Sequence, residues 1–217
     1  MPHRAIAALK NNSCPGRCVG IALAPGCNCI EDGGVKTPRL FLVAAAVSLI
    51  SVAPVAAYPF MKRITWWPQA WLGIVFSWGA LVGWPAVTGE LSLTTFLLWF
   101  GSISWVIGYD TLYAIQDIED DALVGVKSSA RRLGSKAPLG IALFYLIAIA
   151  LWAGAIWSVR ADWLALLALV PAALHLANQA LRANPSDGEL ALKLFRSNRT
   201  CGLLVFLGML AVGLSSR

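Results

Sequence analysis

The twenty residues 138–157, PLGIALFYLIAIALWAGAIW, contain no charged side chain. Twenty residues of α-helix are about 30 Å long, which matches the hydrocarbon thickness of a lipid bilayer. A helix that is apolar on all sides is buried, either inside a large protein or in lipid. This stretch therefore predicts a membrane-spanning helix and an all-α fold.

The composition of the whole chain agrees with that prediction. Of 217 residues, 58% are hydrophobic and only 13% are charged, whereas soluble domains are about one quarter charged. Ten residues are Trp, which membrane interfaces favour. The net charge of +6 lies in short segments between apolar stretches and not along one face, so we expect a lipid bilayer and no nucleic acid as partner.

Six apolar stretches are candidate membrane spans, and together they predict a polytopic transmembrane bundle. They are residues 40–58, 70–87, 93–111, 138–157, 163–181 and 201–215. The connecting segments 59–69, 112–137 and 182–200 hold two, four and four Lys or Arg residues, whereas the two short turns hold only Arg160. Basic loops stay on the cytoplasmic side, so we expect these three loops to be cytoplasmic, in a bacterial inner membrane.

Residues 1–37 differ from the rest of the chain. Pro, Gly and Asn are frequent there, and four cysteines occur at positions 14, 18, 27 and 29. The cysteine spacing does not match the paired spacings of zinc sites. An irregular tail is the favoured interpretation, over a disulfide pair, a metal site or a signal peptide. The predicted domains are this tail, 1–37, and a transmembrane domain, 38–217.

Acidic residues are concentrated in the stretch YDTLYAIQDIEDDALVGVKS, residues 109–128. On one continuous helix, Asp110, Asp117 and Asp121 would lie within about 40° of one line. Three carboxylates on one stripe repel one another, so a cation is expected to neutralise them. Carboxylate oxygens without His or Cys suit Mg2+, which usually shares its coordination shell with substrate phosphates.

The neighbouring residues extend this prediction to a substrate. Tyr113 lies one turn from Asp110 on the same side, and the basic residues Lys62, Arg63, Lys127 and Arg131 can bind phosphate charge. The pattern favours a diphosphate with a membrane-soluble tail, because ionisable groups at membrane depth are costly without a function. In the alternative, the acids pair with Lys127, Arg131 and Arg132 in a solvated loop. The residues alone leave both possibilities open.

Residues 109–134, YDTLYAIQDIEDDALVGVKSSARRLG, resemble the second Asp-rich motif of the UbiA superfamily of intramembrane prenyltransferases. YPFMKRITWWPQ (58–69), FSWGALVGWPA (76–86) and LFRSNRTCGL (194–203) are similar to the branch that prenylates 4-hydroxybenzoate in ubiquinone biosynthesis. The resemblance extends from about residue 40 to the end. It implies a family fold of nine transmembrane helices with a lateral opening to lipid, in which two Asp-rich motifs bind a prenyl diphosphate through Mg2+.

The resemblance also implies an activity and the residues responsible for it. The activity is Mg-dependent transfer of a polyprenyl group from polyprenyl diphosphate to a ring carbon of 4-hydroxybenzoate. Asp117 and Asp121 correspond to the metal-binding pair, and Asp110 to a further catalytic acid, either a second metal ligand or a group near the reacting carbon. The substrate-binding residues expected at this site are Lys62, Arg63, Tyr113, Lys127 and Arg131.

The family's first motif, N-D-x-x-D-x-x-x-D, is not found in this sequence, where Glu31 and Asp32 are the sole acids upstream of the first predicted span. The six spans correspond to the last six of the family's nine. One hypothesis is that residues 1–37 come from a different reading frame than the upstream coding region. The alternative function is a non-catalytic membrane fragment or partner subunit.

Two further patterns predict helix packing. Gly79 and Gly83 form a small-x-x-x-small pair, which favours close contact between helices. His175, Asn178 and Gln179 form a polar patch within the fifth span, and interhelical hydrogen bonds are the favoured interpretation of that patch.

Overall fold

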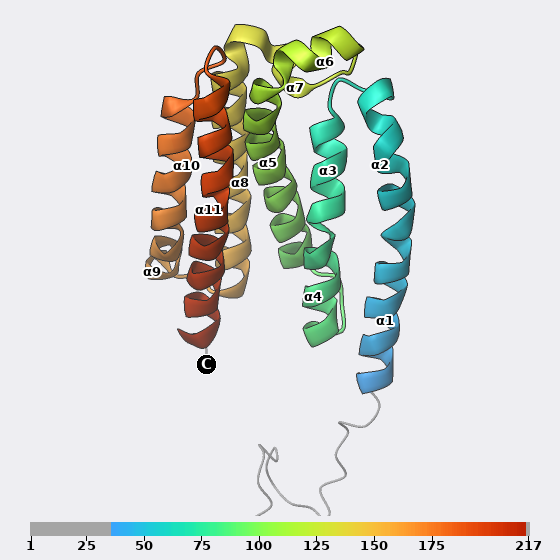
Figure 1. Ribbon diagram of the computed structural model, residues 1–217. Helices are drawn as coiled ribbons and strands as arrows, with labels where there is room; N and C mark the ends of the chain where they lie inside the picture. The colour runs from blue at the N-terminus through green and yellow to red at the C-terminus, as the bar shows by residue number, and fades with distance from the viewer. Residues whose placement is uncertain (1–35, 216–217) are drawn as a thin grey trace, which may run out of the picture. The chain divides into compact units, whose positions relative to one another are not determined.

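The computed structural model describes the backbone of residues 36–215 and the side chains of residues 42–215 (Figure 1). Every regular element in that range is a helix, which confirms the all-α prediction. The predicted tail and its four cysteines lie outside the described residues, except that Lys36 and Thr37 begin the first helix. The helices are α1 Lys36–Ile50, α2 Val52–Ile64, α3 Pro68–Phe76, α4 Trp78–Thr88, α5 Leu93–Gln116, α6 Ile118–Val124, α7 Ser129–Leu133, η3 Gly134–Lys136, α8 Ala137–Val159, α9 Trp163–Leu166, η4 Leu167–Leu169, α10 Val170–Arg182 and α11 Gly188–Ser215.

Five helical stretches of the described chain are long and apolar enough to cross a membrane. They are Leu42–Ile64, Pro68–Thr88, Ser129–Val159, Trp163–Arg182 and Gly188–Ser215. Several join two or more of the elements above, as α3 and α4 do. The chain is therefore a polytopic membrane protein, as its composition predicts.

The third predicted span, 93–111, coincides with α5, which has 24 residues but is not among those five stretches. Twelve of its residues are buried, including Thr94, Thr95 and Thr111. These residues are buried because α5 lies between α3 and α4 on one side and α8 and α11 on the other (Figure 1). A helix enclosed by protein can hold hydroxyl groups that find partners there, and Thr94 lies 2.7 Å from the Ser158 hydroxyl.

The last predicted span, 201–215, is too short. Helix α11 begins at Gly188 and has 28 residues, so most of the segment expected to be a loop at 182–200 is helical. Asp187 starts the helix, because its carboxylate accepts a hydrogen bond from the Leu190 backbone N–H at 2.9 Å. The polar residues in the first part of α11 lower its hydropathy, so the sequence suggests a loop there although these residues are helical.

Glycines allow two helix pairs, α5 with α8 and α11 with η4, to approach closely. A Cβ added to Gly108 of α5 would lie 2.4 Å from Tyr145 of α8, and one added to Gly208 of α11 would lie 2.5 Å from the Ala168 carbonyl oxygen. Gly101 is equally tight against Trp152. At Gly79 and Gly83, by contrast, no atom of the described chain comes within 4 Å of such a Cβ. The prediction of close packing at that pair is wrong here.

A buried polar network connects α8, α10 and α11, and it confirms the prediction of interhelical hydrogen bonds. The Tyr145 hydroxyl donates to Gln179 Oε1 at 2.7 Å. Gln179 Nε2 donates to Ser197 Oγ at 2.7 Å and lies 3.1 Å from His175 Nε2. Asn178, the third member of the predicted patch, is exposed.

Replacing Gln179 with Leu is expected to destabilise the bundle. The change leaves the Tyr145 hydroxyl buried without its acceptor, which costs about 1–3 kcal/mol of the free energy of unfolding. Thermal unfolding in detergent measures the effect. Asn178→Leu is the control, since it removes an exposed amide from the same helix and should change stability by less than about 0.5 kcal/mol. Equal shifts in the two variants would contradict a stabilising role for the network.

Candidate active site

The predicted acidic site lies where α5 ends and α6 begins, at the top of Figure 1. Helix α5 stops at Gln116, and Asp117 (φ −96°, ψ 10°) separates it from α6. The single straight stripe of three aspartates is therefore wrong. Glu119, Asp120 and Asp121 instead occupy the first turn of α6, where the helix dipole stabilises negative charge. Asp117 and Asp121 remain one turn apart, because the Asp121 N–H donates to the Asp117 carbonyl at 2.8 Å.

The end of α2 is tied to the loop that follows α6. The Lys127 backbone N–H donates to the Lys62 carbonyl at 3.1 Å, and Lys127 Nζ donates to the Ile64 carbonyl at 3.2 Å. The charge of Lys62 acts on both Asp110 and Asp121, and so does the charge of Asp117. Asp110 and Asp121 thus share the electrostatic influence of Lys62 and of Asp117. Arg63 is exposed on the last turn of α2.

Arg131 is held beside the acids by backbone carbonyls. Its guanidinium donates to the Asp121 carbonyl at 3.2 Å and to the Val126 carbonyl. The Trp66 ring lies under two cations, 5.6 Å from the Arg131 guanidinium and 5.9 Å from Lys127 Nζ. Such cation–π contacts position the charges without neutralising them.

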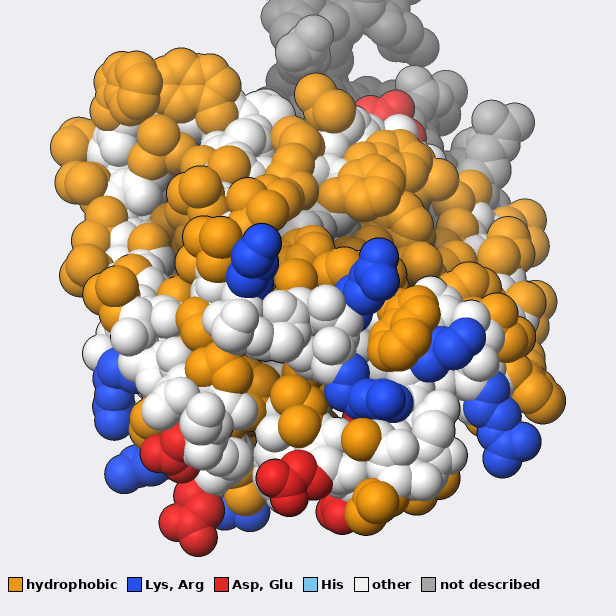
Figure 2. All heavy atoms as spheres, turned by 90° about the horizontal axis from the view of Figure 1, so that it is seen from above, with side chains coloured by type: hydrophobic (Ala, Val, Ile, Leu, Met, Phe, Trp, Pro, Cys, Tyr) orange, Lys and Arg blue, Asp and Glu red, His pale blue; other side chains and the backbone are white. Residues whose placement is uncertain are grey.

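Direct pairing of these acids and bases, the alternative left open by the sequence, is not found between residues 42 and 215. The single ion pair in that range joins Arg160 and Asp162 at 2.8 Å, in the turn between α8 and α9. Figure 2 shows the end with the acidic site from above, with blue Lys and Arg side chains across the face and most red acidic ones along its lower edge. Both kinds of charge are therefore available to a ligand.

The electrostatics of Asp121 favour a cation beside its carboxylate. Partial burial raises the pKa of its carboxyl, and Asp117 raises it further, against the lowering influence of Lys62, Ser128 and Arg131. The net pKa lies above the ordinary value. Holding this carboxylate ionised therefore costs free energy, which a bound metal ion would offset.

The acidic residues offer an incomplete metal site. In the described part of the chain, no three His, Cys, Asp or Glu side chains gather closely enough to hold a metal ion. Asp117 and Asp121 supply oxygen donors alone, and Mg2+ is commonly held by one or two carboxylates with phosphate oxygens completing its shell. These two residues fit a magnesium ion shared with a substrate diphosphate.

Three buried polar residues that sequence reasoning missed hold this end of the bundle together. The Ser129 N–H donates to Gln69 Oε1 at 3.2 Å, and the Ser129 and Thr111 hydroxyls lie 2.7 Å apart. These bonds join α3, α5 and α7, so they fix the loop that contains the acids. Thr111 and Ser129 lie inside the Asp-rich motif, but nothing in their spacing shows that they meet.

Tyr113 of α5 packs on α11, with its ring centroid 5.0 Å from that of Phe195. Below it, a recess of about 340 Å³ lies between α5 and α11. We call it the aromatic recess; Trp105, Tyr109, Phe195, Arg196, Asn198 and Arg199 line it. In the sequence, these arginines are explained by the rule that basic loops stay on the cytoplasmic side. Only the fold places them beside these aromatic rings.

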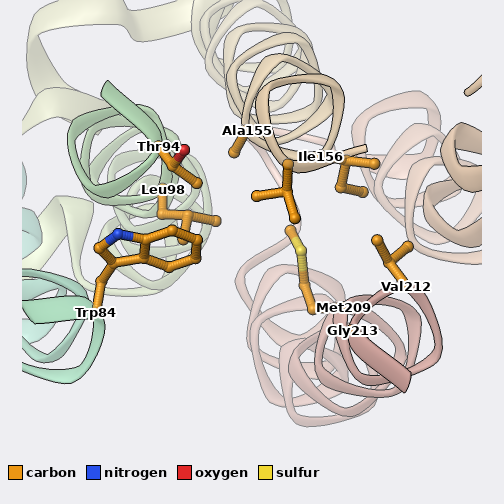
Figure 3. A pocket seen from close by; sticks show the side chains of 9 residues that line it. Trp84, Thr94, Leu98, Ala155, Ile156, Met209, Val212 and Gly213 are labelled. Atoms are coloured by element: carbon orange, nitrogen blue, oxygen red, sulfur yellow. The ribbon is translucent and has the colours of Figure 1, made fainter. Parts of the chain in front are cut away.

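A second cavity, of about 170 Å³, lies toward the opposite end of the bundle. Figure 3 shows Trp84 of α4 and Leu98 of α5 on one side of it, facing Ile156 of α8 and Met209 of α11 on the other. Its lining is almost entirely apolar. The space suits a hydrocarbon group and offers no chemistry of its own.

Comparisons with known proteins identify the family. The model of the UbiA prenyltransferase family matches residues 38–212. Proteins named 4-hydroxybenzoate polyprenyltransferase, mitochondrial, are 42% identical in Bos taurus over 168 residues (76% of this chain, 44% of the relative) and 41% in Homo sapiens over 163 residues (73% and 43%). The Arabidopsis thaliana protein of that name is 39% identical over 160 residues (73% and 39%).

The chain thus spans less than half the length of these relatives. No solved structure matches it. The family match covers nearly all of the described helices, including the Asp-rich stretch from which the resemblance was inferred. The chain belongs to the UbiA prenyltransferase family.

Proposed function

We propose that this protein transfers a polyprenyl group from a polyprenyl diphosphate to 4-hydroxybenzoate, in the ubiquinone pathway. The observation that supports this most strongly is the pair Asp117 and Asp121, set beside Lys62, Lys127 and Arg131 at one end of an apolar bundle. The acidic and basic residues suit a metal-bound diphosphate, and the apolar bundle suits its hydrocarbon tail. The names of the relatives supply the acceptor.

The proposed reaction breaks the C–O bond between the allylic carbon and the diphosphate, whose oxygen keeps the electron pair. The ring carbon ortho to the 4-hydroxyl then bonds to the allylic carbon, and the proton of that ring carbon passes to the released diphosphate. Lys62, Lys127 and Arg131 bind the diphosphate oxygens. Asp117 and Asp121 would hold Mg2+, which would supply positive charge to stabilise the leaving group. We place Asp110 near the reacting carbon, and the apolar helices exclude water from it.

The membrane helices support a lipid bilayer as the surroundings of this reaction. The relatives are named as mitochondrial proteins, so the prediction of a bacterial inner membrane has no support from them. The cytoplasmic placement of the basic loops stays a prediction from charge alone.

Reconstitution tests the proposed function. The chain in lipid vesicles, given a labelled polyprenyl diphosphate, 4-hydroxybenzoate and Mg2+, should form a prenylated hydroxybenzoate of the expected mass. Chelation of the metal should stop product formation. Binding of the diphosphate without any transfer would instead favour the alternative, a non-catalytic membrane subunit.

The raised pKa of Asp121 predicts a pH dependence of metal binding. Mg2+ binds the ionised carboxylate, so protons compete with it, and the competition begins at a higher pH than for an ordinary Asp because the pKa is raised. Affinity for Mg2+, measured through binding of a prenyl diphosphate analogue, should therefore fall as the pH is lowered, before the ordinary value of about 3.9 is reached. Asp121→Asn should flatten that part of the profile. A wild-type affinity that stays constant down to that pH would contradict the prediction.

A further inference from the structure

The aromatic recess has a rigid floor. The Trp105 ring packs edge-on against Tyr109 at 5.3 Å between centroids, and Tyr109 packs against Phe195 at 5.8 Å. Trp105 Nε1 donates to Asn198 Oδ1 at 3.0 Å, which fixes the indole. The amide of Asn198 is fixed in turn, since its Nδ2 donates to the carbonyls of Leu194 and Phe195. A preorganised aromatic surface binds a flat ring with little loss of side-chain entropy.

Two cations stand at the edge of this floor. Arg196 and Arg199 are three residues apart on α11, so their side chains lie on one side of the helix. Both are exposed, and neither makes an ion pair or a side-chain hydrogen bond to any residue of the described chain. Their planar guanidiniums therefore have free donors with the geometry that binds a carboxylate or phosphate through two parallel hydrogen bonds.

The combination of an aromatic floor, whose rings are inclined to one another, and two free guanidiniums selects among anions. A polyprenyl diphosphate has no aromatic ring, and Lys62, Lys127 and Arg131 are available for its head. An aromatic carboxylate uses both features of the recess, because its ring packs against the aromatic side chains while its charge meets the arginines.

The recess also lies beside the acidic site. Tyr109 lines it, and Asp110 is the next residue, about 100° further around α5. Tyr113, one turn on, contacts Phe195 of the floor. A ring held in the recess is thus next to the helix face that presents Asp110 to Lys62.

We propose that the aromatic recess binds the aromatic acceptor, with the carboxylate of the acceptor on Arg196 and Arg199 and its ring on Trp105, Tyr109 and Phe195. The identity of the acceptor as 4-hydroxybenzoate rests on the proposed function. Asn198 is a positioning residue, because it acts on the ligand through Trp105. The arginines set specificity for an acid over a neutral ring.

Equilibrium binding to the whole chain in a zwitterionic detergent tests this proposal without turnover. The two probes are 4-hydroxybenzoate and 4-hydroxybenzamide, which has nearly the same shape but no charge. The wild-type chain should prefer the benzoate. The double variant Arg196→Gln, Arg199→Gln should lose about ten-fold in affinity for the benzoate and none for the benzamide, as expected for removal of charge-assisted hydrogen bonds. Arg182→Gln, an exposed arginine at the end of α10, is the matched control and should change neither affinity.

Each other outcome overturns the proposal. Equal weakening of both probes in the double variant would assign the arginines to packing. If the double variant binds the benzoate as well as the wild type does but retains less phosphatidylglycerol relative to phosphatidylcholine, the arginines bind a lipid headgroup. The proposed function is tested separately. If the preference for the acid depends on the two arginines but the vesicles form no prenylated product, the recess is the acceptor site and the proposed transfer is wrong.

Discussion

Replacing both Asp117 and Asp121 with Asn is expected to weaken Mg2+-dependent binding of a prenyl diphosphate by about a hundred-fold or more, and to remove transfer activity. The two carboxylates lie one turn apart across the break between α5 and α6, with Lys62 and Arg131 beside them. Asparagine keeps the shape of each side chain but removes the charge that attracts the metal. Lys62 and Arg131 would still attract the diphosphate, so the weak binding that remains should no longer depend on Mg2+. Titration of Mg2+ against a bound, labelled prenyl diphosphate measures both quantities.

Asp120→Asn is the matched control for that experiment. Asp120 lies between Asp117 and Asp121 in the sequence, in the first turn of α6, and its side chain is exposed. This change removes one negative charge, half of what the double substitution removes, but it takes no oxygen from the predicted metal pair. A loss of Mg2+ binding free energy about half as large as in the double variant would show that the stretch acts through its total charge, and the assignment of ligands would be wrong.

The membrane fold was predictable because long apolar runs leave few structural choices. The run at 138–157 lies entirely within α8, and the runs at 70–87 and 163–181 also match helical stretches. The predicted boundaries were wrong where a helix includes residues that are not apolar. Residues 188–200 are polar enough to suggest a loop, yet they continue α11, since a helix does not end where the membrane does.

The acidic site was predictable in its members but not in its shape. The spacing of Asp110, Asp117 and Asp121 assumed one continuous helix, whereas the chain changes direction at Asp117. A local pattern indicates which residues share a helix face, but tertiary contacts decide where that helix ends. The tie between Lys127 and the end of α2 is such a contact, across more than sixty residues of sequence.

The aromatic recess was not predictable from spacing. Trp105 and Asn198 are hydrogen-bonded although they are 93 positions apart. Each of its residues has an ordinary explanation when taken alone, such as interfacial anchoring for the arginines. Only the packing of α11 against α5 combines them into a surface with a defined chemistry.

Replacing Gly208 with Leu is expected to destabilise the bundle more than any change at an exposed glycine. A Cβ at this position would lie 2.5 Å from the carbonyl oxygen of Ala168 and 3.3 Å from its carbonyl carbon, both backbone atoms of η4. A side chain can rotate away from a new neighbour, but a backbone carbonyl moves only with its helix. Separating α11 from η4 exposes packed surface on both, so we expect a loss of about 3 kcal/mol, at the upper end of the usual cost of overpacking.

Gly79→Leu is the matched control, because Gly79 is exposed, lies in a helix and has no described atom within 4 Å of the new Cβ. Leucine there should raise stability slightly, by up to about 1 kcal/mol, since glycine is the poorer helix former. If Gly208→Leu yields no folded protein, Gly208→Ala keeps the comparison measurable, since its single methyl group meets the same carbonyl. Thermal unfolding midpoints in detergent decide the matter. A Gly208→Ala protein as stable as the wild type would mean that α11 and η4 can separate without loss, and that this glycine is not needed for their contact.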